Sequence, residues 1–189
     1  MEKIIAKWIN NIWYKDFFIG TWLVPFSLLY IDVMRFRRWL YKTGRKQVTK
    51  LSVPVIIVGN ITVGGTGKTP LVIFLAQQLK TAGFKVGVVS RGYGGSAQQW
   101  PQLVDKNSAA QFIGDEPLLM ARHLDCPVAV SPIRAEAAQY LIDEHGCDVI
   151  ISDDGLQHYA LARDIEIAVI DGERRFGNNF YLPAGPLRE

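Results

Sequence analysis

The sequence predicts an α/β fold in which helices flank a mostly parallel sheet, preceded by an amino-terminal helical arm. Short apolar runs rich in β-branched residues alternate with helical patterns, as is typical of parallel strands joined by crossover helices. A glycine-rich segment joins the first such run to the first helix, and an apolar stretch followed by a basic one precedes the first strand. With 189 residues, the chain is long enough for one domain of this kind.

The charge is divided unevenly along the chain. Residues 1–50 carry ten Lys or Arg and three Asp or Glu, a balance of +7, whereas the remaining residues carry eleven and fifteen, a balance of −4. A basic arm beside a slightly acidic domain suggests that the arm faces an anionic surface. We therefore place a domain boundary near Lys50, with a helical arm over residues 1–50 and the α/β core over residues 51–189.

The two cysteines argue against a disulfide scaffold or a structural zinc site. Cys126 and Cys147 do not form a C-x-x-C pair, and no histidine pair accompanies them at metal-binding spacing. We expect both to be small buried apolar side chains in a reducing compartment.

The predicted elements follow one another in order through the core. Strands are predicted at residues 53–58, 84–89, 102–104, 128–130, 149–152 and 165–170. Helices are predicted at residues 71–79, 118–124 and 134–145.

The segment after the first predicted strand has the pattern of a phosphate-binding loop. Residues 62–69 read Thr-Val-Gly-Gly-Thr-Gly-Lys-Thr, a Walker A pattern except that Thr62 replaces the first glycine. In such a loop, main-chain N–H groups cradle phosphates, Lys68 reaches the terminal phosphates, and the Thr69 hydroxyl contacts Mg²⁺. The residues expected to bind the nucleotide are Thr62, Gly64, Gly65, Thr66, Gly67, Lys68 and Thr69. The position of this loop between a strand and a helix predicts a P-loop NTPase-like fold.

A later apolar strand ends in two carboxylates. Residues 149–152 lead directly into Asp153 and Asp154. Carboxylates at the end of a parallel strand emerge at the ligand-binding edge of the sheet and can hold Mg²⁺ directly or through water. Either aspartate could be the direct ligand. His158 follows closely and either orients an aspartate, contacts a phosphate or fills a loop.

The arm has the pattern of an interfacial membrane segment. Residues 17–31 contain no charge, but Pro25 interrupts the run, which is shorter than the ~20 apolar residues that span a bilayer. Seven Lys or Arg and no acidic residue follow between Val33 and Lys50, interleaved with aromatic residues. Aromatic rings at headgroup depth and cations facing anionic lipid favour peripheral or monotopic attachment.

The composition of the arm is consistent with two other interpretations. It could be a helix that packs on the core and exposes a solvated basic face. Basic and aromatic residues together also suit a nucleic-acid backbone, but the apolar run has no role there, so we expect no nucleic-acid partner.

Several nucleotide-binding classes lack support in the sequence. A GTPase would need an N-K-x-D segment, which does not occur, and a partition-type ATPase would have a second lysine where Val63 stands. The signature sequence of a transporter ATPase is also missing.

Five motifs in order carry a resemblance to a known family. They lie at residues 58–70, 90–95, 114–117, 153–158 and 174–189. This set is similar to the tetraacyldisaccharide 4′-kinases, the lipid A 4′-kinases of Gram-negative bacteria, whose loop pattern also has the threonine found here at Thr62. The resemblance covers essentially the whole chain, including the arm.

The resemblance implies that the γ-phosphate of ATP is transferred to the 4′-hydroxyl of a lipid A precursor, tetraacyldisaccharide 1-phosphate. The reaction would take place at the anionic surface of the inner membrane, on its cytoplasmic face. Asp115 would be the base that accepts the hydroxyl proton, although a carboxylate there could merely cap a helix. Arg134 and Arg188 would assist at the phosphates or substrate, although Arg134 could be an ordinary surface charge. The residues implied to hold Mg²⁺ are Thr69, Asp153, Asp154 and Glu189.

The family pattern also implies that part of the protein is missing. Family members continue into a second lobe, which supplies a histidine that pairs with the catalytic carboxylate. We therefore expect a truncated form with weakened nucleotide binding and without full kinase activity. The competing hypothesis is a membrane-associated regulatory ATPase, and a plain binding module is a third. The regulatory ATPase predicts neither the motif at residues 114–117 nor the carboxyl-terminal motif.

Overall fold

The computed structural model of the chain describes residues 11–14, 20–93, 95 and 99–189. Residues 17–19 of the apolar run and Gly94 of the second motif lie outside them. The described residues form two compact units. The first consists of the described residues within Met1–Lys46, Asn60–Thr66 and Ile170–Glu189, and the second of those within Gln47–Gly59 and Gly67–Val169. The division near Lys50 into an arm and a core stays a prediction.

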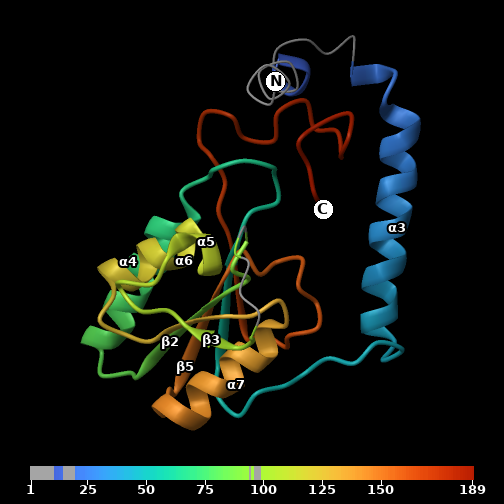
Figure 1. The fold of residues 1–189 in the computed structure, drawn as a ribbon. Coiled ribbons are helices and arrows are strands. Elements are labelled where there is room, and N and C mark those ends of the chain that lie inside the picture. The colour runs from blue at the N-terminus through green and yellow to red at the C-terminus, as the bar shows by residue number, and fades with distance from the viewer. Residues whose placement is uncertain (1–10, 15–19, 94, 96–98) are drawn as a thin grey trace. The chain divides into compact units, whose positions relative to one another are not determined.

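The second unit is built around a six-stranded sheet with the order β3-β4-β2-β5-β1-β6 (Figure 1). All neighbouring strands are parallel except β3 and β4. The strands are β1 (Val55–Gly59), β2 (Val86–Ser90), β3 (Gln102–Leu103), β4 (Val128–Val130), β5 (Val149–Asp153) and β6 (Ile165–Ala168). The helices of this unit are α4 (Lys68–Thr81), α5 (Ala110–Ile113), α6 (Asp115–His123) and α7 (Arg134–His145).

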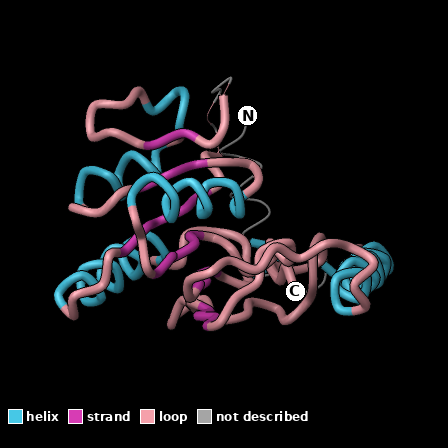
Figure 2. Tube along the Cα trace, turned by 90° about the horizontal axis from the view of Figure 1, so that it is seen from below, coloured by secondary structure: helices cyan, strands magenta, loops and turns pink. Residues whose placement is uncertain are grey.

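The connections explain why helices cover both faces of the sheet. The chain passes from β1 through α4 to β2, and from β4 through α7 to β5, in opposite directions across the sheet. Because such crossovers are right-handed, opposite directions place α4 and α7 on opposite faces. Figure 2 shows helices on both sides of the strands. Every residue of β1, β2, β4 and β5 is buried, which explains their continuous apolar sequences.

The predicted elements are all present, with ends that differ by at most three residues. The helix predicted at residues 134–145 has those bounds, whereas α4 begins at Lys68, three residues before the predicted start. The difference arises because Pro70 is tolerated in the first turn of a helix. The short helix α5 is not among the predicted elements. The prediction of an α/β fold with a mostly parallel sheet is confirmed.

The first unit contains the helix α3 (Val24–Lys42), which has Pro25 in its first turn. The chain turns just before this helix, so the apolar run is interrupted beside Pro25, as predicted. Polar contacts tie α3 to the carboxyl-terminal motif. The Ser27 hydroxyl donates to the carbonyl of Tyr181 at 2.7 Å, and the Tyr30 hydroxyl donates to the carbonyl of Arg188 at 2.9 Å. None of the helices in the described part of the chain combines the length and hydropathy needed to cross a membrane.

Candidate nucleotide-binding site

The amino terminus of α4 has the features of an anion-binding helix end. Gly67 is its N-cap and has a φ of 81°, a left-handed conformation that glycine adopts without strain. No side chain caps the helix there, and the first turn contains no acidic residue. The main-chain N–H groups of this turn and the positive end of the helix dipole can therefore face a phosphate.

Lys68 and the acidic end of β5 meet at one edge of the sheet. Strands β1 and β5 are parallel neighbours, with Val58 opposite Asp153. Their carboxyl ends consequently lie side by side, and Lys68 follows one while Asp154 follows the other. The Lys68 Nζ lies 3.5 Å from Oδ1 of Asp154. This ion pair places the loop lysine beside the carboxylates of the second predicted motif.

Asp153 is a buried carboxylate without a compensating hydrogen bond. The residue is 1% exposed, and neither side-chain oxygen has a hydrogen-bond partner among the described residues. The pKa of Asp153 is raised to about 6, chiefly by burial and then by the charges of Glu116 and Asp154, against the lowering effect of Lys68 and Arg134. The ionised form of a carboxylate that is buried without hydrogen bonds is unfavourable unless a cation pairs with it.

Arg134 is buried and acts on the main chain of this acidic turn. Its Nη2 donates to the carbonyl of Asp153 at 3.3 Å and to that of Asp154 at 2.7 Å. Only 6% of Arg134 is exposed, so the alternative of an ordinary surface charge is excluded. Asp154 has a φ of 47°, which is unfavourable for a non-glycine residue. The two hydrogen bonds from Arg134 stabilise this conformation.

Asp115 lies in the first turn of α6 and is exposed. It follows the N-cap, Gly114, and no side chain makes a capping hydrogen bond to this helix. A carboxylate in a first turn still favours the helix end through its charge, and the role as a base stays a prediction.

His158 lies in the turn that follows the acidic residues. Its N–H donates to the carbonyl of Gly155 at 2.9 Å, and its own carbonyl accepts from Nη2 of Arg163 at 2.7 Å. These contacts fix its main chain and leave the role of its imidazole ring a prediction.

The sequence alone predicts no role for Glu116. This residue is exposed, yet its charge contributes more than that of Asp154 to raising the pKa of Asp153. The available signal was its place beside Asp115 in the motif at residues 114–117.

In the first unit, Asn60 organises the beginning of the loop. The side chain is fully buried, and its Nδ2 donates to the carbonyl of Gly64 at 3.0 Å. Its Oδ1 accepts from Nη1 of Arg188 at 3.1 Å. Asn60 lies within the motif at residues 58–70, but the sequence indicates no role for it. Its contacts with Gly64 and Arg188 form only in the folded chain.

The carboxyl-terminal motif pairs with the same loop segment. The N–H of Arg188 donates to the carbonyl of Ile61 at 2.7 Å, and the N–H of Val63 donates to the carbonyl of Pro186 at 2.9 Å. Thr62 is buried between them and forms an antiparallel bridge with Leu187. This pairing explains how a threonine, with its β-branched side chain, fits at the first position of the loop. Glu189 follows in the same unit, and its role at a metal stays a prediction.

The carboxylate chemistry fits Mg²⁺ as a partner of bound phosphates. In the described ranges, no group of three His, Cys, Asp or Glu residues is close enough to hold a metal ion without other ligands. Mg²⁺ in kinases is held by one or two carboxylates together with phosphate oxygens and water. The two buried oxygens of Asp153, which lack hydrogen bonds, suit that kind of site.

The mostly parallel sheet, the loop between β1 and α4, and the acidic end of β5 define an α/β protein with a P-loop NTPase-like fold. Residues 19–189 match the family model of LpxK, tetraacyldisaccharide-1-P 4′-kinase. The chain belongs to this family.

Individual relatives agree with this assignment. A tetraacyldisaccharide 4′-kinase from Legionella pneumophila (strain Corby) is 53% identical over 185 residues, which cover 98% of this chain and 57% of the relative. One from Coxiella burnetii (strain RSA 331) is 54% identical and covers 95% of this chain and 55% of the relative. The crystal structure of an "apo" form of LpxK from Aquifex aeolicus in complex with ATP is 37% identical. It has a TM-score of 0.79 and covers 90% of this chain and 54% of that one. The chain thus spans little more than half the length of these relatives.

Proposed function

We propose that the chain is the nucleotide-binding part of an ATP-dependent kinase that phosphorylates the 4′-hydroxyl of tetraacyldisaccharide 1-phosphate, a lipid A precursor. The observation that carries the proposal is the ion pair between Lys68 and Asp154, which sets the loop lysine against the acidic end of β5. Family membership supports the choice of acceptor, and the ATP complex of the Aquifex protein supports the choice of nucleotide.

The residues divide the work in a way that suits phosphoryl transfer, which depends mainly on positioning and electrostatic stabilisation. Lys68 neutralises charge on the terminal phosphates, and Asp115, exposed at the start of α6, accepts the proton of the acceptor hydroxyl. Arg134 acts through the carbonyls that it holds at the acidic turn, and Arg188 acts through Asn60 on the loop. His158 lies near the same turn and is proposed to assist there.

The residues that would hold Mg²⁺ are Thr69, Asp153, Asp154 and Glu189. When bound, the ion would neutralise the negative charge that develops on the phosphate during transfer. Asp153 must be deprotonated for this purpose, and the charges of Lys68 and Arg134 favour that form.

We further propose that α3 attaches the protein to the cytoplasmic face of the inner membrane. An exposed apolar stripe at helical spacing begins in the turn before this helix and continues along it, and each residue in it is between 58% and 77% exposed: Trp22, Phe26, Leu29, Val33 and Phe36. Basic residues follow, and the cation of Arg45 lies 4.4 Å from the ring centre of Trp39. An apolar stripe beside cations favours an anionic lipid surface.

Labelled ATP and tetraacyldisaccharide 1-phosphate test the reaction. They are supplied to the chain itself and to a fusion that continues it with the remaining residues of the Legionella relative. Label on the 4′ position of the lipid in the fusion, abolished by Lys68→Ala, supports the kinase. Release of free phosphate alone would support the regulatory ATPase instead.

A further inference from the structure

Arg174 lies against the first half of the phosphate loop. Its Nη1 is 3.9 Å from the point that a Cβ atom would occupy on Gly64, and both residues belong to the same compact unit. Gly64 has a φ of 116°, so its main chain adopts a conformation that other residues rarely accept. The guanidinium therefore lies next to the main chain of the loop, with no intervening side chain on Gly64.

The main chain of Arg174 is held in place by Asp171. The Oδ1 of Asp171 accepts hydrogen bonds from the N–H groups of Glu173 at 2.9 Å and Arg174 at 2.8 Å. The N–H of Arg175 donates to the carbonyl of Asp171 at 2.8 Å, which completes the turn. The hydrogen bond from the Arg174 N–H is the main cause that lowers the pKa of Asp171. The base of the Arg174 side chain is thus fixed.

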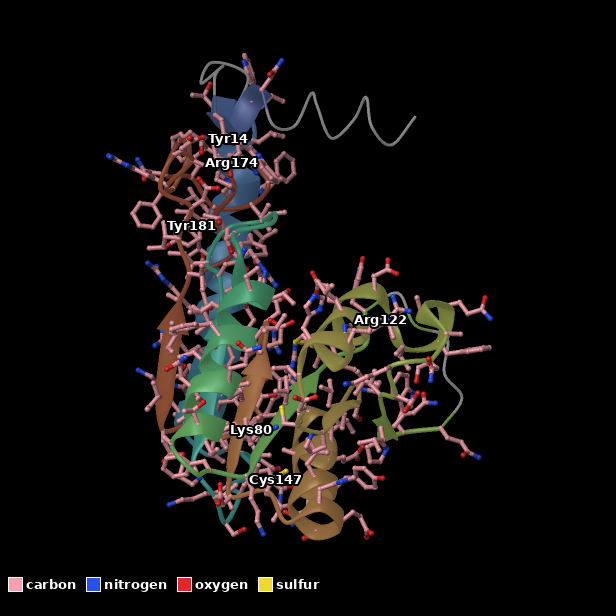
Figure 3. The ribbon with its side chains drawn as sticks, turned by 90° about the vertical axis from the view of Figure 1, so that its left-hand side faces the viewer. Tyr14, Lys80, Arg122, Cys147, Arg174 and Tyr181 are labelled. Atoms are coloured by element: carbon pink, nitrogen blue, oxygen red, sulfur yellow. The ribbon has the colours of Figure 1, made fainter. Side chains whose placement is uncertain are left out.

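The guanidinium itself remains available to a ligand. Within the described part of the chain, the Arg174 side chain makes no hydrogen bond or ion pair, and the residue is exposed to solvent. Tyr14 lies near Arg174 (Figure 3), and its pKa is raised chiefly by burial, against the lowering effect of the charge of Arg174. A cation positioned beside a phosphate loop by a structured turn is arranged to meet an anion.

We propose that Arg174 binds a terminal phosphate at the phosphate loop, as an arginine supplied by the protein's own chain. The planar guanidinium can donate two parallel hydrogen bonds to phosphate oxygens, which a lysine cannot do. Arginines in this position stabilise the charge on a phosphoryl group in transfer. The inference rests on the proposed function. It assigns Arg174 a phosphate contact in addition to the roles proposed for Lys68 and Arg188.

Two sources could supply that phosphate. One is the γ-phosphate of the nucleotide, and the other is the phosphate monoester carried by the lipid acceptor. Both present a terminal phosphate with two or more free oxygens, so they offer Arg174 the same chemistry. They differ in which ligand loses affinity when the guanidinium is removed.

The first experiment measures the affinity of the chain for ATP and for ADP, each with Mg²⁺, by calorimetric titration. Arg174→Ala should weaken ATP binding about tenfold or more, the loss expected for one charge-assisted contact, while ADP binding changes less than about twofold. Arg174→Lys should recover part of the loss. The matched control is Arg175→Ala, which removes an exposed cation from the adjacent position and should leave both affinities unchanged.

The second experiment compares tetraacyldisaccharide 1-phosphate with the same lipid lacking its phosphate. If Arg174 binds the acceptor, Arg174→Ala should remove the preference for the phosphorylated lipid and leave the preference for ATP over ADP intact. The inference would be overturned if Arg174→Ala kept both the preference for ATP over ADP and the preference for the phosphorylated lipid, whether or not it weakened ATP and ADP binding equally. Failure of the unchanged chain to bind either nucleotide would refute the proposed function itself, and this inference with it.

Discussion

Arg188 donates a hydrogen bond from Nη1 to Oδ1 of Asn60, at 3.1 Å and across 128 residues of sequence. The other end of the same amide donates to the carbonyl of Gly64 at 3.0 Å. One buried side chain thus joins the carboxyl-terminal motif to the beginning of the phosphate loop. The arrangement makes the shape of the loop dependent on residues at the far end of the chain.

Asn60→Ala should weaken ATP binding about tenfold and lower the free energy of unfolding by about 1–3 kcal/mol. The reason is that the substitution leaves the partly buried carbonyl of Gly64 and the Arg188 guanidinium without this partner. Urea unfolding and nucleotide titration measure the two effects. Asn107→Ala is the matched control, because Asn107 is exposed. Unchanged ATP affinity in Asn60→Ala would contradict the positioning role.

Arg134→Ala should destabilise the protein by about 2–3 kcal/mol, because a charged donor to two carbonyls is lost in a buried place. Arg134→Lys keeps the charge but lacks the planar fork, so it should recover only part of the stability. Thermal and urea unfolding measure both variants. Equal stability of Arg134→Ala and the unchanged protein would show that the turn at Asp153 and Asp154 holds its conformation unaided.

In metal-free buffer, the stability of the protein should fall as the pH rises from about 4 to about 6. The pKa of Asp153 is about 6 in the fold against 3.8 ordinarily, so the folded state binds more protons in this range. The loss in the free energy of unfolding is nearly complete above about pH 6. It amounts to roughly 3 kcal/mol, at about 1.36 kcal/mol per pKa unit.

Asp153→Asn tests this effect through urea unfolding between pH 4 and 8. The variant should lose this part of the pH dependence and be more stable than the unchanged protein at pH 7, yet bind ATP with Mg²⁺ more weakly. A variant that is less stable at pH 7 would contradict the assignment of an uncompensated carboxylate.

Arg163→Ala should lower the free energy of unfolding by about 2–4 kcal/mol, from the loss of about three hydrogen bonds. The guanidinium donates to the carbonyls of Leu156, His158 and Leu161, and so holds the turn after the acidic residues. Its ion pair with Glu166 is exposed, so Glu166→Gln should cost less than about 1 kcal/mol. Similar losses in the two variants would place the main contribution in the ion pair instead.

Replacing Phe26 and Leu29 together by serine should reduce sedimentation of the protein with anionic phosphatidylglycerol vesicles several-fold. Each side chain exposes apolar surface on α3 whose burial in lipid favours attachment. Phe74→Ser is the control, because Phe74 is a similarly exposed aromatic residue on α4. Undiminished sedimentation of the double variant would refute attachment through this stripe.

The alternating apolar runs and helical patterns were sufficient to predict the α/β class and nearly all the elements. Local signals determine such features: β-branched runs favour buried strands, and glycine, proline and charged residues mark the ends of helices. The sequence also predicts the loop at residues 62–69 and the pair Asp153–Asp154. Each is a short contiguous pattern whose chemistry depends on neighbours in the sequence. The order of apolar and basic residues predicts the arm in the same way, and its boundary near Lys50 stays a prediction.

Only the tertiary structure decided which of these patterns meet. The strand order places β5 beside β1 and so brings Asp154 within reach of Lys68. It also brings Arg134 to the acidic turn and buries it there. In the first unit, the carboxyl-terminal motif folds back on the loop and joins Asn60 to Arg188. These contacts link residues far apart in the chain, and their formation depends on tertiary packing and, within the sheet, on crossover handedness. No local pattern carries that information, which is why the partners of Asn60, Glu116 and Arg174 emerged only from the fold.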